Sequence, residues 1–170
     1  MQTIRSICKS LVTNSWFIFA MDCDSSVWSA PLQRYVGSWQ GEVKVDGSAV
    51  TPHGYAQSNT FGWTLGGRFL EERGTGANGS SFIGLWGYDA RSGLYRAHYF
   101  LAPTGDVVAI THDWDEQSRT FSGSADLGGG IRLVAEDRFI DANTYEWSTT
   151  ISDSTGTTLS RMRALERRVT

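Results

Sequence analysis

Asp137 is the most unusual residue of the sequence, because its position predicts a carboxylate inside an apolar interior. In the segment 131–140, alternate positions hold Leu133, Ala135, Asp137 and Phe139, so Asp137 shares the apolar face of a predicted strand. A buried carboxylate has a raised pKa unless a positive charge pairs with it. Such a group can act as a general acid or base, which makes Asp137 a candidate catalytic residue.

His112 is the second candidate for acid–base chemistry. In the segment 107–114 the more apolar parity holds Val108, Ile110, His112 and Trp114, which predicts that His112 points inward among aromatic side chains. It could serve as a polar group in a binding pocket. The alternative is a rim residue, or a hydrogen-bonded core histidine without a chemical role.

The neighbours of Asp137 decide whether its carboxylate has a chemical or a structural role. Proximity to His112 or Tyr145 favours an acid–base pair. An internal ion pair with Arg161 or Arg163 would instead make the carboxylate structural, which is the commoner arrangement for a buried charge. The residues alone leave both alternatives open.

Other catalytic and metal-binding motifs are missing from the sequence. The histidines His53, His98 and His112 lie on separate segments without the spacing of metal ligands, and strand parity places His98 on the outer face. The glycine-rich pieces open no helix, so they are turns and not phosphate loops. No serine lies in a Gly-x-Ser-x-Gly elbow. The sequence therefore implies no metal and no cofactor.

Aromatic side chains are abundant, with 7 Trp, 6 Tyr and 8 Phe. They can pack a core or form the wall of an apolar pocket, and core packing is the commoner use. The candidates for a pocket wall come mostly from Trp-rich predicted strands: Trp39, Phe61, Trp63, Trp86, Tyr99, His112, Trp114 and Trp147.

Ten segments separated by turn residues predict the strands that carry these side chains. The first, 38–46, alternates cleanly, with Trp39 and Val43 on one face and Gln40 and Glu42 on the other. The others are 55–65, 68–73, 81–88, 94–101, 107–114, 120–125, 131–140, 145–151 and 157–168.

The connections between these segments are short and carry strong turn signals such as Gly128-Gly129-Gly130. They leave no room for crossover helices, so neighbouring strands should run antiparallel, and closure avoids long exposed edges. We predict an all-β, up-and-down barrel of about eight to ten strands, wide enough for a small ligand. A short helix over 29–37, introduced by Pro31, should plug one end.

Length and charge narrow the classes of protein. With 170 residues, the chain is predicted to form one domain over 29–170, after an extension over 1–28. A net charge of −3 provides no broad basic face, which argues against nucleic acid as a partner. Both cysteines, Cys8 and Cys23, lie in the extension, so the barrel has no disulfide framework.

The extension loosely imitates a signal peptide, since Arg5 and Lys9 precede an apolar stretch over 11–21. Asn14 and Ser15 interrupt this stretch, and it is shorter than the about 20 apolar residues that span a bilayer. We therefore expect a cytoplasmic protein without a membrane span, with export as the alternative. Exposed strand edges and the extension could support a homodimer.

Three motifs carry a resemblance to a known family. They are Gly37-Ser38-Trp39-Gln40-Gly41-Glu42, Leu65-Gly66-Gly67-Arg68-Phe69-Leu70-Glu71-Glu72 and Gly84-Leu85-Trp86-Gly87-Tyr88-Asp89. In this order they resemble the uncharacterised bacterial domain-of-unknown-function family numbered fifteen seventy-nine, over roughly residues 31–168. The resemblance implies a calycin-like barrel related in shape to lipocalins, fatty-acid-binding proteins and haem-binding nitrobindins. It implies no agreed activity.

Two details follow from the resemblance. Trp39 is similar to the lipocalin tryptophan that closes the barrel floor, and Arg168 or Arg167 looks like the arginine that covers it by a cation–π contact. Many relatives have an acidic residue near positions 98–101, where this chain has none, so a role of that carboxylate does not transfer.

Asp89 needs no chemical role, because it can bind backbone amides of its own hairpin.

Binding of a small hydrophobic or amphipathic molecule inside the barrel is the leading hypothesis. One alternative is an enzyme of the isomerase, cyclase or hydratase type that acts on a hydrophobic metabolite, with Asp137 and His112 as acid–base groups. The other is a structural or interaction protein with a filled interior, which would lack a cavity of ligand size, about 300 Å³ or more.

Overall fold

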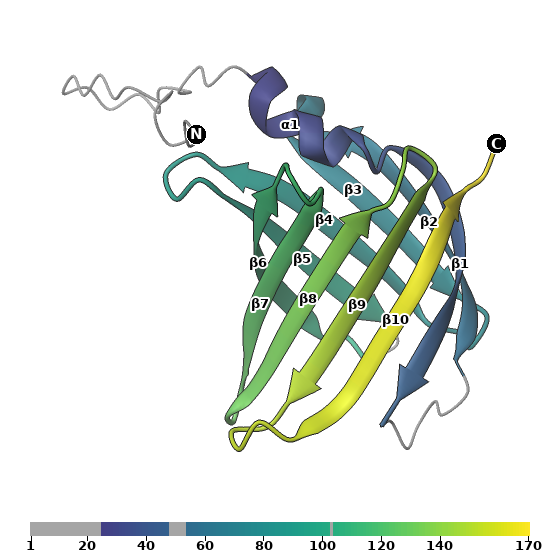
Figure 1. Ribbon diagram of the computed structural model, residues 1–170, viewed down its shortest axis with the longest axis vertical. Coiled ribbons are helices and arrows are strands. Elements are labelled where there is room, and N and C mark those ends of the chain that lie inside the picture. Colours follow the sequence, from purple (N-terminus) through teal and green to yellow (C-terminus); the bar gives the residue numbers. More distant parts are fainter. Residues whose placement is uncertain (1–24, 48–53, 103) are drawn as a thin grey trace.

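The computed structural model describes residues 25–47, 54–102 and 104–170, and in them ten antiparallel strands close into a barrel (Figure 1). A helix precedes the strands, and a 3₁₀ turn, η2, follows the second. The elements are α1 (Ser25–Gln33), β1 (Gly37–Asp46), β2 (Tyr55–Thr64), η2 (Leu65–Gly67), β3 (Phe69–Gly76), β4 (Ser81–Asp89), β5 (Leu94–Ala102), β6 (Val107–Asp115), β7 (Thr120–Gly128), β8 (Ile131–Phe139), β9 (Thr144–Ser152) and β10 (Thr158–Arg168).

Each predicted strand segment corresponds to one observed strand, so the all-β barrel is confirmed. Closure comes from β1, which pairs with β2 on one side and with β10 on the other, so that Trp39 lies opposite both Asn59 and Arg168. β3 and β7 run longer than predicted, because cross-strand pairing continues to Gly76 and to Gly128. No strand of the barrel keeps an unpaired edge.

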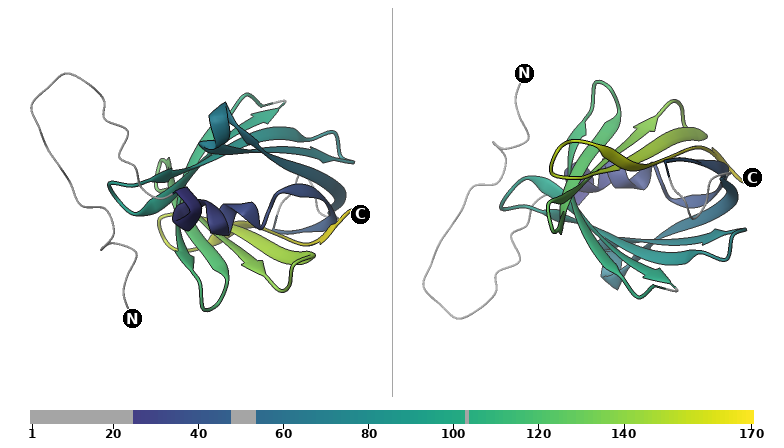
Figure 2. Two further views of the ribbon diagram at one scale, coloured as in Figure 1. Left: turned by 90° about the horizontal axis from the view of Figure 1, so that it is seen from above. Right: turned by 90° about the horizontal axis from the view of Figure 1, so that it is seen from below.

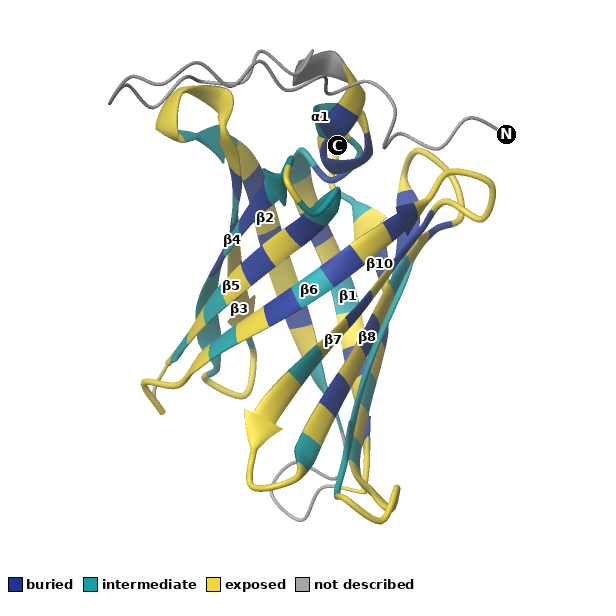
Figure 3. Cartoon of the chain, turned by 90° about the vertical axis from the view of Figure 1, so that its left-hand side faces the viewer, coloured by how far each residue is buried: buried dark blue, intermediate teal, exposed yellow. Residues whose placement is uncertain are grey.

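Buried and exposed residues alternate along the strands (Figure 3), as expected when successive side chains point to the interior and to the outer surface. The predicted faces of β5 and β6 are confirmed, since His112 is 2% exposed inside the barrel and His98 lies on the outer surface. Asp137 also occupies an inward position, opposite Phe121 on one neighbouring strand and Trp147 on the other.

The helix α1 lies across one opening of the barrel (Figure 2), as predicted, although it begins at Ser25, before the predicted start at 29. The added turn brings Trp28 into the core, where it stacks on Tyr88 at 6.0 Å between ring centroids. Tyr95 donates a hydrogen bond to the Trp28 carbonyl oxygen over 2.9 Å, which fixes this turn on the barrel rim. The rest of the predicted extension, residues 1–24, lies outside the described residues, as do Cys8 and Cys23.

Arg168 closes the same end of the barrel from the last strand. Its guanidinium lies 4.2 Å from the centre of the Trp39 ring, which confirms the predicted cation–π contact and selects Arg168 over the exposed Arg167. The guanidinium also donates hydrogen bonds to the carbonyl oxygens of Arg34 and Val36 in the segment that follows α1. The helix connection and the end of β10 are thereby locked together.

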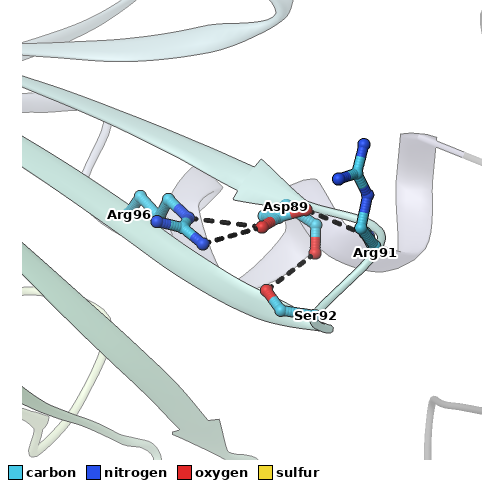
Figure 4. Close-up of polar contacts among 4 residues, drawn as sticks. All are labelled: Asp89, Arg91, Ser92 and Arg96. Atoms are coloured by element: carbon cyan, nitrogen blue, oxygen red, sulfur yellow. Dashed lines mark hydrogen bonds and ion pairs between the residues drawn. The ribbon is translucent and has the colours of Figure 1, made fainter.

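Asp89 stabilises the β4–β5 hairpin, as predicted (Figure 4). Its carboxylate accepts a hydrogen bond from the Arg91 amide over 3.0 Å and from the Arg96 guanidinium over 3.0 Å. Its carbonyl oxygen accepts the Gly93 amide over 2.8 Å and the Ser92 hydroxyl over 3.4 Å. These contacts use both the side chain and the backbone of Asp89, so its place in the hairpin is explained without a catalytic role.

Within the described ranges, no helix is both long enough and apolar enough to cross a membrane.

Candidate functional site

The interior divides into two halves, and the half next to α1 is filled. Tyr35, which follows the helix, enters the barrel axis and is 1% exposed. Aromatic rings surround it, with Phe139 at 4.7 Å, Phe61 at 4.9 Å and Tyr145 at 5.3 Å between ring centroids. The remaining buried members of this cluster, called here the aromatic plug, are Trp28, Leu32, Trp39, Leu70, Trp86, Tyr95, Ala97, Trp114 and Phe121.

The half away from α1 is not filled in this way. Its buried apolar side chains form two separate clusters, one on β1 and β10 around Val43 and Ala164, the other on β6 and β8 around Ile110 and Leu133. Inward-facing side chains on these walls keep accessible surface although they face the barrel axis. They are Val108, Ala125, Ile151 and Met162, together with Tyr99 and Trp147, which also pack against the plug. We call the interior region between these walls the lower chamber.

A layer of polar side chains separates the plug from the lower chamber, and Glu166 is at its centre. Glu166 is fully buried, and its Oε1 accepts hydrogen bonds from Trp147 Nε1 over 3.2 Å and from Asn59 Nδ2 over 3.4 Å. Gln57 in turn donates to Asn59 over 3.1 Å. The second carboxylate oxygen, Oε2, is buried without any hydrogen-bond partner, so one strong acceptor in this layer is unused.

Glu72 and Asp137 complete the polar layer. Glu72 is 6% exposed, and its Oε2 accepts a hydrogen bond from Trp86 Nε1 over 3.2 Å. Asp137 accepts a hydrogen bond from the Tyr35 hydroxyl over 2.7 Å. The predicted inward carboxylate is therefore present, but its partner is a tyrosine of the plug segment.

Two inward glycines make room for these carboxylates. A methyl group on Gly41 would lie 2.8 Å from the Glu166 carboxylate and 2.6 Å from a backbone oxygen of β10. A methyl group on Gly84 would lie 3.2 Å from Glu72 Oε2 and 2.9 Å from the Tyr99 ring. A side chain at either position would therefore require its neighbours to shift, including β10 at Gly41 and the Tyr99 ring at Gly84.

Burial governs the electrostatics of the polar layer. Desolvation raises the pKa of Glu72 to about 8, of Glu166 to about 7 and of Asp137 to about 6. Hydrogen bonds from Trp86, Trp147 and Tyr35 oppose these increases but do not cancel them. Near neutral pH the layer is therefore only partly ionised.

His112 lies beside this layer and has no hydrogen-bond partner on either ring nitrogen. Its ring packs 4.6 Å from the Trp86 ring, and a methyl group on Gly123 would come within 2.4 Å of His112 Nδ1. Burial lowers the pKa of His112 to about 4, so the imidazole is neutral at physiological pH. No hydrogen bond joins His112 to Asp137, and the imidazole does not form the predicted acid–base pair.

The predicted ion pair of Asp137 is wrong. Arg161 and Arg163 both lie on the outer face of β10, where Arg161 contacts Thr150 and Arg163 pairs with Asp46. They face outward because the inward parity of this strand belongs to Met162, Ala164 and Glu166. In the described part of the chain no lysine or arginine is buried, so the interior carboxylates have no cationic partner there.

The eight residues predicted for a pocket wall fall into three places. Trp39 and Phe61 lie within the packed plug, of which Trp86 and Trp114 are also members. Trp63 and Trp114 lie at the rim, where their indole N–H groups donate to Gln33 and Glu116. The other four, Trp86, Tyr99, His112 and Trp147, surround the polar layer.

Two functional candidates, Glu72 and Glu166, escaped the sequence analysis. Strand alternation could have placed both glutamates inside, because Glu72 lies two residues after the buried Leu70 and Glu166 lies two residues after the buried Ala164. In β10 exposed arginines lie at the intervening positions, and in β3 the charged residues Glu71 and Arg73 flank Glu72, which obscured the alternation.

Two open depressions are present at the described surface, and the first includes Gly41 and Gln57, which border the polar layer from the β1–β2 wall. One, of about 660 Å³, runs over the outer face of β1, bordered by Gln40, Ser58 and Arg167. The other, of about 360 Å³, lies at the β7–β8 hairpin beside Asp126 and Arg132. Over residues 25–47, 54–102 and 104–170, no group of three His, Cys, Asp or Glu side chains is arranged to hold a metal ion.

Comparisons with known proteins support the fold. No family model matches this chain, and no curated protein does, so the resemblance to family fifteen seventy-nine stays a prediction. Among solved structures, Rv2717c from M. tuberculosis is similar with a TM-score of 0.64 and 18% identity, over 84% of this chain and 97% of that one.

Two further structures share the barrel. A protein of unknown function from the DUF3598 family of Nostoc punctiforme matches with a TM-score of 0.59 and 11% identity, over 81% of this chain and 48% of that one. The S-type phycobiliprotein lyase CPES of Guillardia theta matches with a TM-score of 0.55 and 10% identity, over 85% and 93%. At these identities the likeness extends to the fold, and the chemistry of this chain has to be argued from its own interior.

Proposed function

We propose that this barrel binds a small amphipathic organic molecule in the lower chamber, with the polar end of the molecule directed at the polar layer. The observation that carries the proposal is the contrast inside one barrel: inward side chains such as Trp147 and Tyr99 keep accessible surface directly below buried carboxylates. An interior built only for stability would be packed throughout, as the plug is.

The chemistry of the walls suits such a ligand. Val108, Ile151 and Met162 offer apolar surface, and the rings of Trp147 and Tyr99 offer flat faces for stacking. A few polar groups at one end of an otherwise apolar pocket fix the orientation of a bound molecule. The aromatic plug closes that end, so the molecule would enter from the opening away from α1.

Native mass spectrometry of the purified protein, compared with the denatured mass, is the first test. A mass difference that disappears on denaturation would identify a retained molecule. For an empty barrel, titration with decanol should change the tryptophan fluorescence of the protein, to which Trp147 contributes. Absence of both effects would contradict binding and favour the filled-barrel alternative.

Two variants test whether the molecule binds in the lower chamber. Ala125→Trp puts an indole on the inner wall of the lower chamber and should abolish binding, whereas Ala109→Trp puts the same group on the exposed face of β6. Equal binding by both variants would exclude the lower chamber as the site.

An enzyme that acts on the bound molecule is the second candidate. The observation in its favour is the Tyr35–Asp137 hydrogen bond, since the pKa of Asp137, about 6, suits proton transfer near neutral pH. A phycobiliprotein lyase uses a similar barrel, so the fold does not exclude catalysis. Once a ligand is known, unchanged turnover in the Asp137→Asn variant would remove Asp137 from any mechanism.

A further inference from the structure

We propose that the molecule held in the lower chamber is an organic cation, an ammonium or guanidinium group on an apolar body, with Glu166 as its direct partner. This inference rests on the proposed function and specifies its ligand class. It is carried by the unused Glu166 Oε2, by the absence of buried basic side chains in the described residues, and by aromatic faces around the carboxylate.

The unused acceptor identifies the kind of group that is missing. Glu166 Oε1 is already satisfied by Trp147 and Asn59, whereas Oε2 is equally buried and accepts nothing. A buried carboxylate oxygen without a donor costs free energy, and a charged donor is the partner that recovers most of it. An ammonium group from a ligand supplies both the hydrogen bond and the charge.

The surrounding carboxylates extend the negative potential beyond Glu166. Glu72 and Asp137 both raise the pKa of Tyr145, as does Glu166, so the three acidic groups act on one buried hydroxyl. Against them, the described interior offers no lysine or arginine, and His112 is neutral. The titratable groups that face this space are Tyr35, Glu72, Tyr99, His112, Asp137, Tyr145 and Glu166.

Aromatic rings complete the cation site. Trp147 and Trp86 direct their indole N–H edges to Glu166 and Glu72. Other rings enclose Trp86, whereas Trp147 keeps accessible surface beside its carboxylate. Cations bind to the faces of such rings, most strongly to tryptophan and where water is excluded. The same chain uses this contact twice at its rim, in Arg168 on Trp39 and Arg34 on Trp114.

A metal ion fits these residues less well than an organic cation. No three acidic, histidine or cysteine side chains of the described chain come together in a metal-binding arrangement. The carboxylates are spread along the walls of a chamber with apolar surface below them, which matches a charged head on an apolar body.

Binding should release protons at pH 7 and below, because Glu72 and Glu166 are partly protonated there and the cation requires an ionised partner. The affinity for an ammonium probe should therefore increase from pH 6 to pH 8.5, below the range in which the amine itself loses its proton. Calorimetry in two buffers of different ionisation enthalpy would detect the released proton.

The test compares three probes that share one apolar body: 1-naphthylmethylamine, 1-naphthylmethanol and 1-naphthylacetate. Calorimetric titration of the full chain at pH 8 should give about tenfold or greater preference for the amine over the alcohol, and the weakest binding for the carboxylate. Equal binding of amine and alcohol would overturn the cation proposal and leave the proposed function standing. Failure of all three probes, with no retained mass, would overturn both.

Matched variants identify the partner. Glu166→Gln keeps the shape of the side chain and should remove the preference for the amine while binding of the alcohol remains. Glu42→Gln removes an exposed charge from the outer face of β1 and should leave the preference unchanged. If Glu166→Gln retains the full preference, Glu166 is not the partner. Alcohol binding and a thermal melt show whether each variant is folded.

Discussion

The two halves of this barrel use the same strands for different purposes. Next to α1, Phe121 and Trp39 are fully buried, and aromatic rings fill the axis around Tyr35. Beyond the polar layer, inward side chains such as Trp147 and Tyr99 keep accessible surface, and the apolar clusters of the two walls remain separate. The tightest packing lies at one end of the barrel, and buried polar atoms without hydrogen-bond partners lie at its border.

This division shows how a closed barrel can contain buried acidic side chains whose burial costs free energy. A rigid plug holds Tyr35 and Trp86 in place, and these side chains donate to Asp137 and Glu72. The acids weaken the fold, because burial disfavours their charged forms. The compact plug compensates for that cost.

The largest expected difference between the halves is in packing. Phe121→Ala should reduce the free energy of unfolding by about 3 to 5 kcal/mol, because it leaves a cavity in the plug. The matched change Phe82→Ala, at a half-buried position of the lower chamber, should cost clearly less. Urea unfolding measures both, and equal losses would show that the lower chamber is as tightly packed as the plug.

The next effect concerns the pH dependence of stability. Burial raises the pKa of Glu72 to about 8, from its ordinary value of 4.5, so its stabilising contribution is complete below pH 4.5 and is lost as pH rises to 8. Glu72→Gln should therefore be more stable than the natural chain at pH 8, on the order of 2 kcal/mol, and little different at pH 4.5. Thermal melts across this range would contradict the assignment if the two curves stayed parallel.

A substitution of Arg168 tests the contacts that join the end of β10 to the segment after α1. Arg168→Met keeps a long apolar side chain over Trp39 but removes the cation–π contact and the hydrogen bonds to Arg34 and Val36. A loss of about 1 to 3 kcal/mol is expected from these interactions together. Arg167→Met, on the exposed face beside it, is the control and should change the midpoint of unfolding little.

The smallest effect is a gain. His112→Leu removes two buried ring nitrogens that have no partner, so the unfolding free energy should rise by about 1 kcal/mol. The natural chain should also lose stability as pH falls from 6.5 to 4, because burial lowers the pKa of His112, and the leucine variant should lack this contribution. Destabilisation by His112→Leu would show that the imidazole has a structural partner.

Much of the candidate site was predictable from strand parity. Alternation placed His112 and Asp137 inside and His98 outside, and the structure agrees. The same rule applied to β3 and β10 identifies Glu72 and Glu166. Parity cannot predict partners across the barrel, however, because Tyr35 and Asp137 are 102 residues apart and meet only when the chain after α1 enters the barrel.

The sequence by itself determined the strands, their antiparallel order and the face of each side chain, because period-two alternation and turn residues are local properties. Only the tertiary structure decided which half of the interior is filled. That outcome depends on where α1 and Tyr35 enter the barrel and on which side chains meet across its axis. The unused Glu166 Oε2 likewise arises from such long-range packing, since a hydrogen-bond vacancy exists only once every neighbour has been placed.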